Sequence, residues 1–160
     1  MGKLGDLLSL APEDTLGTAA PIVGAAGAPL METRQSELIR VLQSLAAELP
    51  NPDWVALVDG NGLIMACIPD QPVVGEDRIS AMAAASLIMA DRVLEEIEGG
   101  RLRFASIAGA KRQLLTVALG AERLLSIGLG PEVPAQATFA SLTRWVPELI
   151  QALKRSFVVS

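Results

Sequence analysis

Hydrophobic residues follow helical spacing in three long stretches of this chain and fill shorter runs between them. The first stretch begins near Thr33, a suitable N-terminal cap, and is stopped by Pro50 and Pro52. Its apolar residues recur every three or four positions, which places them on one face: Leu38, Val41, Leu42, Leu45 and Leu49. The pattern therefore predicts an amphipathic helix over residues 33–49.

Two apolar runs, Trp54–Val58 and Leu63–Ile68, flank the sequence Asp59-Gly60-Asn61-Gly62. Glycine and asparagine tolerate the positive φ angles of a tight turn, so the two runs are predicted to form a β-hairpin. Neither run alternates apolar with polar residues. This is typical of strands that are covered on both faces.

A second helix is predicted over residues 76–98, between a loop with Pro69 and Pro72 and the glycine pair Gly99-Gly100. We expect one apolar stripe to face the sheet: Ile79, Met82, Val93, Leu94 and Ile97, with Ala83, Ser86 and Ala90 between them. The opposite side is also apolar, with a charged end: Ala81, Ala84, Ala85 and Ile88, then Arg92 and Glu95. Because such a helix needs a covering layer on each side, we expect one layer to come from another molecule.

Three further strands are predicted over residues 101–107, 112–119 and 124–129. The turns between them are short, which implies an antiparallel meander. The first strand starts Arg101-Leu102-Arg103-Phe104, an alternation that suits a sheet edge with one wetter face. We expect its free backbone to pair with the same strand of a second copy.

The last stretch, residues 135–157, has a third apolar helical face: Phe139, Leu142, Val146, Leu149, Ile150, Leu153 and Phe157. Pro147 lies inside it and predicts a kink or a break into two helices. The order helix, two strands, helix, three strands, helix defines an α+β fold with an antiparallel five-stranded sheet between helical layers. Residues 1–31, rich in Ala, Gly and Pro, are expected to be a flexible leader before a domain over residues 32–158.

Composition removes several classes of function. Of the 160 residues, 51% are hydrophobic, which is high for a monomer and indicates an interface. A net charge of -5 and 3% aromatic residues argue against a nucleic-acid partner. One cysteine and no histidine leave no ligand set for zinc or haem, so no cofactor is expected. No apolar run approaches the roughly 18 residues of a membrane span, and we expect a cytoplasmic protein.

Short motifs that could carry chemistry fit structural roles better. Asp59-Gly60-Asn61-Gly62 begins like a calcium loop, but Leu63 stands where a third ligand is needed. The segment Gly109-Ala110-Lys111-Arg112 lacks the upstream glycine and the ending of a phosphate loop. Both are interpreted as turns.

The candidate catalytic side chains are equally weak. Glu95, Glu96 and Glu98 gather at a helix end where solvation is easy. Cys67 lies in an apolar strand, and the chain has no histidine to activate it. We therefore expect a protein without an active site of its own.

Three segments in this order resemble the roadblock/dynein light chain family: the hairpin WVALVDGNGLIMACIP, the helix DRISAMAAASLIMADRVLEEI and the meander RLRFASIAGAKRQLLTVALGAERLLSIGLG. The resemblance covers Thr33 to Phe157, while the long leader and Pro147 depart from the family pattern. It implies a homodimer whose sheet continues across edge strands, with the second helices of the two copies side by side. It also implies binding or regulation of a Ras-like small GTPase, as in the most similar bacterial and archaeal members, or alternatively a nucleotide-independent adaptor role in a larger complex.

Carried over by position, the resemblance assigns two surfaces. The partner-binding surface falls on the second helix, at Ala81, Ala84, Ala85, Ile88 and Arg92. The self-pairing edge falls on Arg101, Arg103 and Ala105.

Two further hypotheses concern what these surfaces do. Arg92, Arg101 and Arg103 are candidates for an arginine supplied to a GTPase in trans, against the simpler interpretation as solubilising surface residues. If hydrolysis is stimulated, we expect the protein to act mainly by ordering the switch residues of the GTPase itself. A small-molecule sensor is disfavoured because the sheet residues offer no convergent polar groups: Val55, Leu57, Leu115, Val117 and Ile127.

Overall fold

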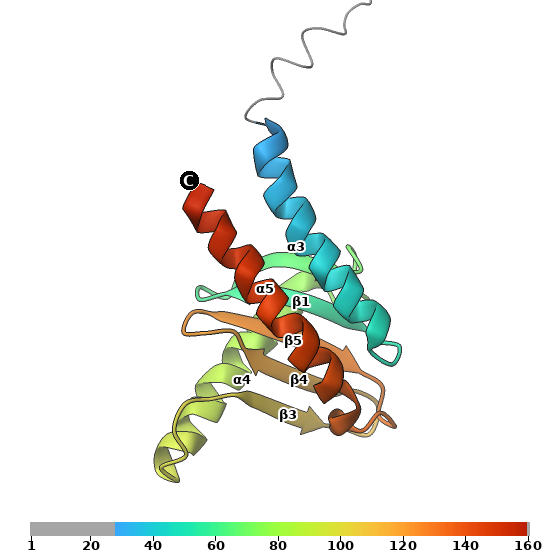
Figure 1. Ribbon diagram of the computed structural model, residues 1–160. Coiled ribbons are helices and arrows are strands. Elements are labelled where there is room, and N and C mark those ends of the chain that lie inside the picture. The colour runs from blue at the N-terminus through green and yellow to red at the C-terminus, as the bar shows by residue number, and fades with distance from the viewer. Residues whose placement is uncertain (1–27, 160) are drawn as a thin grey trace, which may run out of the picture. The chain divides into compact units, whose positions relative to one another are not determined.

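The computed structural model describes residues 28–159, and side chains from Gln35 to Arg155. By internal contacts the chain divides into two units, residues 1–36 and Glu37–Ser160, and the second contains the sheet. The elements are α3 (Ala28–Glu48), β1 (Trp54–Asp59), β2 (Ile64–Ile68), α4 (Glu76–Glu96), β3 (Phe104–Ala108), β4 (Gln113–Ala118), β5 (Arg123–Leu129), the short 3-10 helix η2 (Ala135–Thr138) and α5 (Phe139–Val159) (Figure 1).

The five strands form one antiparallel sheet in the order β2-β1-β5-β4-β3. The hairpin and the meander predicted from the sequence are both present, and β1 joins them by pairing with β5. All or nearly all residues of these two central strands are buried, as the unbroken apolar runs predicted. The α+β fold with three main helices is therefore confirmed.

The larger core lies on the face of the sheet that α3 and α5 cover (Figure 1). The predicted apolar face of the first helix packs there from Leu38 to Leu49, together with Leu142 and Leu149 of α5. The sheet contributes alternate residues such as Leu57, Leu115 and Ile127. This face supplies most of the buried apolar surface that stabilises the unit.

The smaller core lies on the opposite face, under α4. Small residues are in register across all five strands there: Ala105, Thr116, Ser126, Ala56 and Cys67. The helix meets them with Ile79, Ala83 and Ser86 as its buried residues. Because few bulky side chains separate them, α4 can lie close to the sheet.

Three boundaries differ from the sequence predictions. The first helix begins at Ala28 rather than Thr33, so residues 28–31, assigned to the leader, are helical, and the rest of that leader lies outside the described residues. The strand expected from residue 101 begins at Phe104. The helix α5 runs through Pro147 instead of breaking there. Pro147 and Thr143, whose carbonyl loses a helical donor, are both exposed, so water can satisfy that carbonyl.

Candidate functional surfaces

The outer side of α4 is exposed where the sequence predicted a partner surface. Ala81, Ala85, Ile88 and Arg92 are exposed, and Ala84 is half-buried. Ile88 leaves 68% of its surface open to solvent. The structure thus brings the five assigned residues together on one helix and leaves that surface uncovered.

Two residues of α4 do not lie where the sequence placed them. Val93 and Ile97 were expected to face the sheet, but they are 51% and 66% exposed. The reason is geometric, because the C-terminal half of α4 extends beyond the strands (Figure 1). Met89, which belongs to neither predicted stripe, is also 68% exposed. We call Met89, Val93 and Ile97 the α4 flank.

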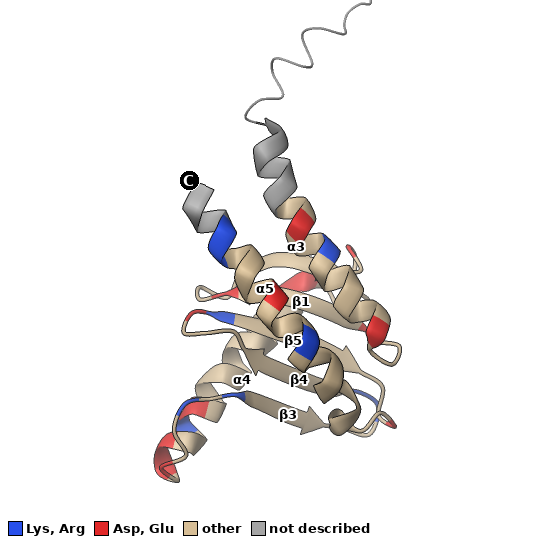
Figure 2. Cartoon of the chain, in the orientation of Figure 1, with Lys and Arg blue, Asp and Glu red and all other residues tan. Residues whose placement is uncertain are grey.

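Charged residues lie next to this flank on α4. Aspartate, arginine and glutamate residues gather at the C-terminal end of α4 (Figure 2). The helix ends at Glu96 with Ile97 as its cap residue, and Glu98 and Gly100 then take positive φ angles of 54° and 82°. The predicted glycine-rich stop is therefore correct, and it leaves the charged end of α4 in solvent.

The strand β3 is an edge strand, hydrogen-bonded to β4 alone. Ala105 lies in it, while Arg101 and Arg103 precede it, which corrects their assignment to the strand. The pairing still reaches Arg103, whose carbonyl oxygen accepts a hydrogen bond from the Ala118 amide at 3.0 Å. Ile107, two residues after Ala105, is 56% exposed and belongs to the same surface. The alternation of side chains from Ala105 could have identified it.

Between α4 and the β3–β4 edge lies a groove of about 530 Å³, which we call the α4 groove. Apolar side chains from both sides line it, including Met82, Ala85, Ile107 and Leu114. The floor includes Trp54, whose indole N–H donates a hydrogen bond to Ser126 Oγ at 3.1 Å. An apolar groove beside a free sheet edge is a surface suited to another protein chain.

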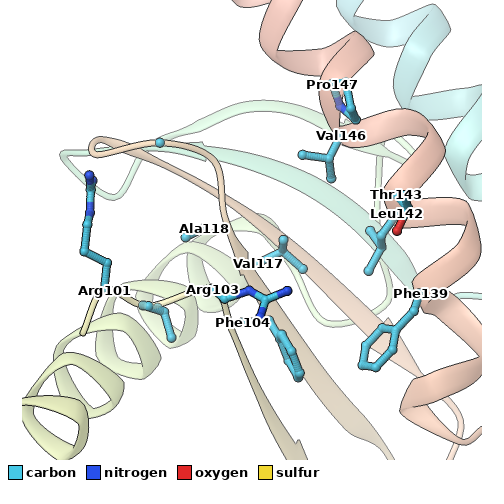
Figure 3. Close-up of a pocket in the computed structure, with 12 residues that line it drawn as sticks. Arg101, Arg103, Phe104, Val117, Ala118, Phe139, Leu142, Thr143, Val146 and Pro147 are labelled. Atoms are coloured by element: carbon cyan, nitrogen blue, oxygen red, sulfur yellow. The ribbon is translucent and has the colours of Figure 1, made fainter. Parts of the chain in front are cut away.

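A second groove, of about 650 Å³, lies between the β3–β4 edge and α5 (Figure 3). Phe104 and Phe139 meet across it, with ring centroids 5.1 Å apart. We call it the α5 groove. No sequence pattern predicts this groove, because its walls come from segments that lie far apart in the chain and each of their residues resembles an ordinary core position.

The motifs interpreted as turns have structural roles. One carboxylate oxygen of Asp59 accepts hydrogen bonds from the amides of Asn61 and Leu63, at 2.8 and 3.0 Å. Gly62 has a φ angle of 79°, as the tight turn requires. Asp59 therefore holds its own hairpin.

Cys67 is buried in β2. Burial, then the nearby charges of Glu76 and Asp70, raise the pKa of its thiol to about 11. Since the thiolate is the reactive form, this cysteine is a poor nucleophile. Among the described residues, no group of three or more potential metal-ligating side chains is placed to hold a metal ion.

No helix in the described part of the chain has the length and apolar character needed to cross a membrane.

The chain belongs to the Roadblock/LC7 domain family, whose model matches residues 38–128. No curated protein sequence matches it significantly.

Solved structures share the fold. Myxococcus xanthus MglB has a TM-score of 0.67 at 16% identity, over 76% of this chain and 90% of its own. The gliding protein MglB from Thermus thermophilus has a TM-score of 0.65 at 16% identity, over 76% and 92%. A Roadblock/LC7 domain from Streptomyces avermitilis has a TM-score of 0.63 at 16% identity, over 76% and 98%. At these identities the likeness establishes the roadblock fold.

Proposed function

We propose that this protein is a non-catalytic homodimeric regulator that binds a Ras-like small GTPase through the outer side of α4. The single observation that carries the proposal is the uncovered apolar surface of α4 around Ile88 in a member of the Roadblock/LC7 family. A monomer gains nothing from exposing such a surface, whereas a protein partner would bury it. The fold likeness to MglB from two organisms supports the same assignment.

The homodimer is supported by three features of the β3 side. The strand β3 has an unpaired edge, with Ala105 and Ile107 exposed or half-buried on the side of α4. The α4 flank extends beyond the sheet without a covering layer. The α4 groove opens beside both. A second copy that pairs β3 with β3 would cover all three at once and would bring the two α4 helices side by side.

A solved MglB is described with a tetrameric arrangement, which supports self-association as the working state of this fold. In the proposed dimer, Met89 and Val93 lie toward the second copy, while Ala81, Ala84, Ile88 and Arg92 remain outward for the GTPase. Ala85 lies at the boundary between the two surfaces, because it is exposed and also lines the α4 groove. The two surfaces share one helix but have different tasks. The protein supplies no reacting group of its own, and any effect on GTP hydrolysis acts through the partner's residues.

The test is capture from the native lysate with wild type, Ile88→Arg and the control Val73→Arg, followed by binding of the captured GTPase loaded with GDP or with a GTP analogue. Val73 is also an exposed aliphatic residue, but it lies in the loop before α4. We expect Ile88→Arg to remain dimeric and to lose the GTPase, because docking would bury an unpaired arginine. We expect Val73→Arg to retain it.

Binding that is identical for the two nucleotide states would replace the regulator with a nucleotide-independent adaptor. An Ile88→Arg protein that becomes monomeric would assign Ile88 to the dimer instead. Capture of no GTPase by the wild type would contradict the proposal.

A further inference from the structure

The α5 groove lies on the face of the sheet opposite α4. Its α5 wall consists of side chains that share one side of the helix: Phe139, Leu142, Thr143 and Val146. The opposite wall is the start of β3 with its preceding segment, and Val117 of β4 lies between (Figure 3). The apolar residues are thus arranged along a trough rather than around a closed cavity.

The tilted ring pair Phe104–Phe139 marks one part of the trough, with planes at 60°. Phe104 still leaves 43% of its surface exposed, although phenylalanine side chains are usually buried when a protein folds. From Phe139 to Pro147 the α5 wall spans about eight helical steps, or about 12 Å. That length fits two turns of another helix.

The positive charges at this groove are unpaired. Arg101 and Arg103 line it, and neither guanidinium forms an ion pair within the described part of the chain. Arg103 reaches across Phe104 toward α5 in Figure 3. By contrast, Arg112, Arg144 and Arg155 each pair with a carboxylate. An apolar trough beside free guanidinium groups is complementary to a ligand that is apolar on one side and acidic next to it.

We propose that the α5 groove binds an amphipathic helix of a partner protein, with two or three apolar anchors in the trough and an acidic side chain on Arg103. Anchors spaced at three, four and seven positions match the spacing of the residues on the α5 wall. A closed pocket would be expected for a small apolar molecule, whereas this groove is partly open to solvent. The occupant is therefore a helical segment that carries aspartate or glutamate.

This site is independent of the proposed GTPase surface. The sheet separates the two, since α4 covers one face and α5 the other. A dimer paired through β3 would bring two α5 grooves to the same face of one continuous sheet. The protein would then hold a GTPase on one side and an adaptor helix on the other.

The test is selection of helical peptides from a random display library on the immobilised full-length protein. The expected result is a set of peptides with apolar residues at three-, four- and seven-residue spacing and at least one adjacent acidic residue. Their affinity is then measured for wild type, for Arg103→Glu and for the matched control Lys111→Glu, an exposed basic residue in the β3–β4 turn. We expect Arg103→Glu to weaken binding at least tenfold and Lys111→Glu to leave it unchanged.

A peptide whose acidic residue is replaced by a basic one completes a double-mutant cycle. Replacing its acidic residue with lysine should weaken binding to wild type and restore binding to Arg103→Glu, which an unfolded variant could not do. Thr143→Glu, at an exposed position of the α5 wall, should weaken binding of the acidic peptides while Ile88→Arg should not, so failure here is distinguishable from failure of the GTPase proposal. Selected peptides without acidic residues, peptides indifferent to Arg103→Glu, or the absence of any selected peptide would each overturn the proposal.

Discussion

Gly128 lies opposite Trp54 in the β1–β5 ladder, and the indole ring occupies the space that a side chain at position 128 would need. A Cβ atom there would lie 2.5 Å from the indole carbons Cε3 and Cζ3. Carbon atoms in contact prefer about 3.5–4.0 Å, so any side chain at 128 displaces the ring or the strand. The same ring lines the α4 groove, which ties that surface to the centre of the sheet.

The substitution Gly128→Ala is therefore expected to lower the free energy of unfolding by about 1–3 kcal/mol. Urea denaturation followed by circular dichroism measures the change. Gly130→Ala is the matched control, because the atoms nearest its Cβ belong to the flexible carboxylate of Glu132. Equal midpoints for the two variants would show that the ring moves at no cost.

The thiol of Cys67 makes stability depend on pH in the alkaline range. Its pKa in the folded protein is raised from 9.0 to about 11, so the unfolded chain releases this proton first. The stabilisation is complete below pH 9 and is lost as pH rises toward 11, up to about 2–3 kcal/mol. Between pH 8 and pH 11, the unfolding free energy of the wild type should therefore fall by up to about 2–3 kcal/mol more than that of Cys67→Ala. The chain has no tyrosine, which simplifies the comparison.

The α4 flank gives a prediction about self-association. Val93→Arg is expected to weaken dimerisation at least tenfold, since an arginine would enter an apolar interface without a partner. Sedimentation velocity across a dilution series measures the dissociation constant. Val73→Arg should associate like wild type. A Val93→Arg protein that dimerises normally would remove the flank from the interface.

The variant Arg92→Ala distinguishes two ways in which this protein could stimulate a GTPase. If this protein accelerates hydrolysis by ordering the partner's switch residues, Arg92→Ala should retain the stimulated rate within a few-fold. Loss of an arginine finger would instead reduce that rate by about 10³-fold or more. Single-turnover hydrolysis at saturating Arg92→Ala protein distinguishes the two, because weaker binding is then overcome.

The sequence predicted the fold because its strongest signals are local. The turn around Asp59 and Gly62 and the glycine stop after α4 each place an element boundary within two residues. The buried face of the helix from Leu38 to Leu49 was equally predictable, because its apolar residues recur with the helical period and only that face is covered.

The surfaces were harder to predict because they depend on where elements end in space. Periodicity places Val93 and Ile97 on the same stripe as Ile79. Ile79 is buried against the sheet, whereas Val93 and Ile97 are exposed because the sheet does not extend beneath them. The α5 groove needs Phe104 and Phe139 to meet, which no local pattern encodes. Pro147 was misjudged for a related reason, since its cost depends on whether water reaches the carbonyl of Thr143.

The sheet order β2-β1-β5-β4-β3 also determines when the sheet can form during synthesis. The bond from Trp54 to Ser126 spans 72 positions, and no strand made before β5 can take its central place. A nascent chain that ends before Arg123 holds two separate two-stranded ribbons, which are marginally stable alone. The apolar surface of α4 is thus made well before the sheet that supports it. The residues of α4 that later cover the sheet therefore stay without it until the fifth strand has been made.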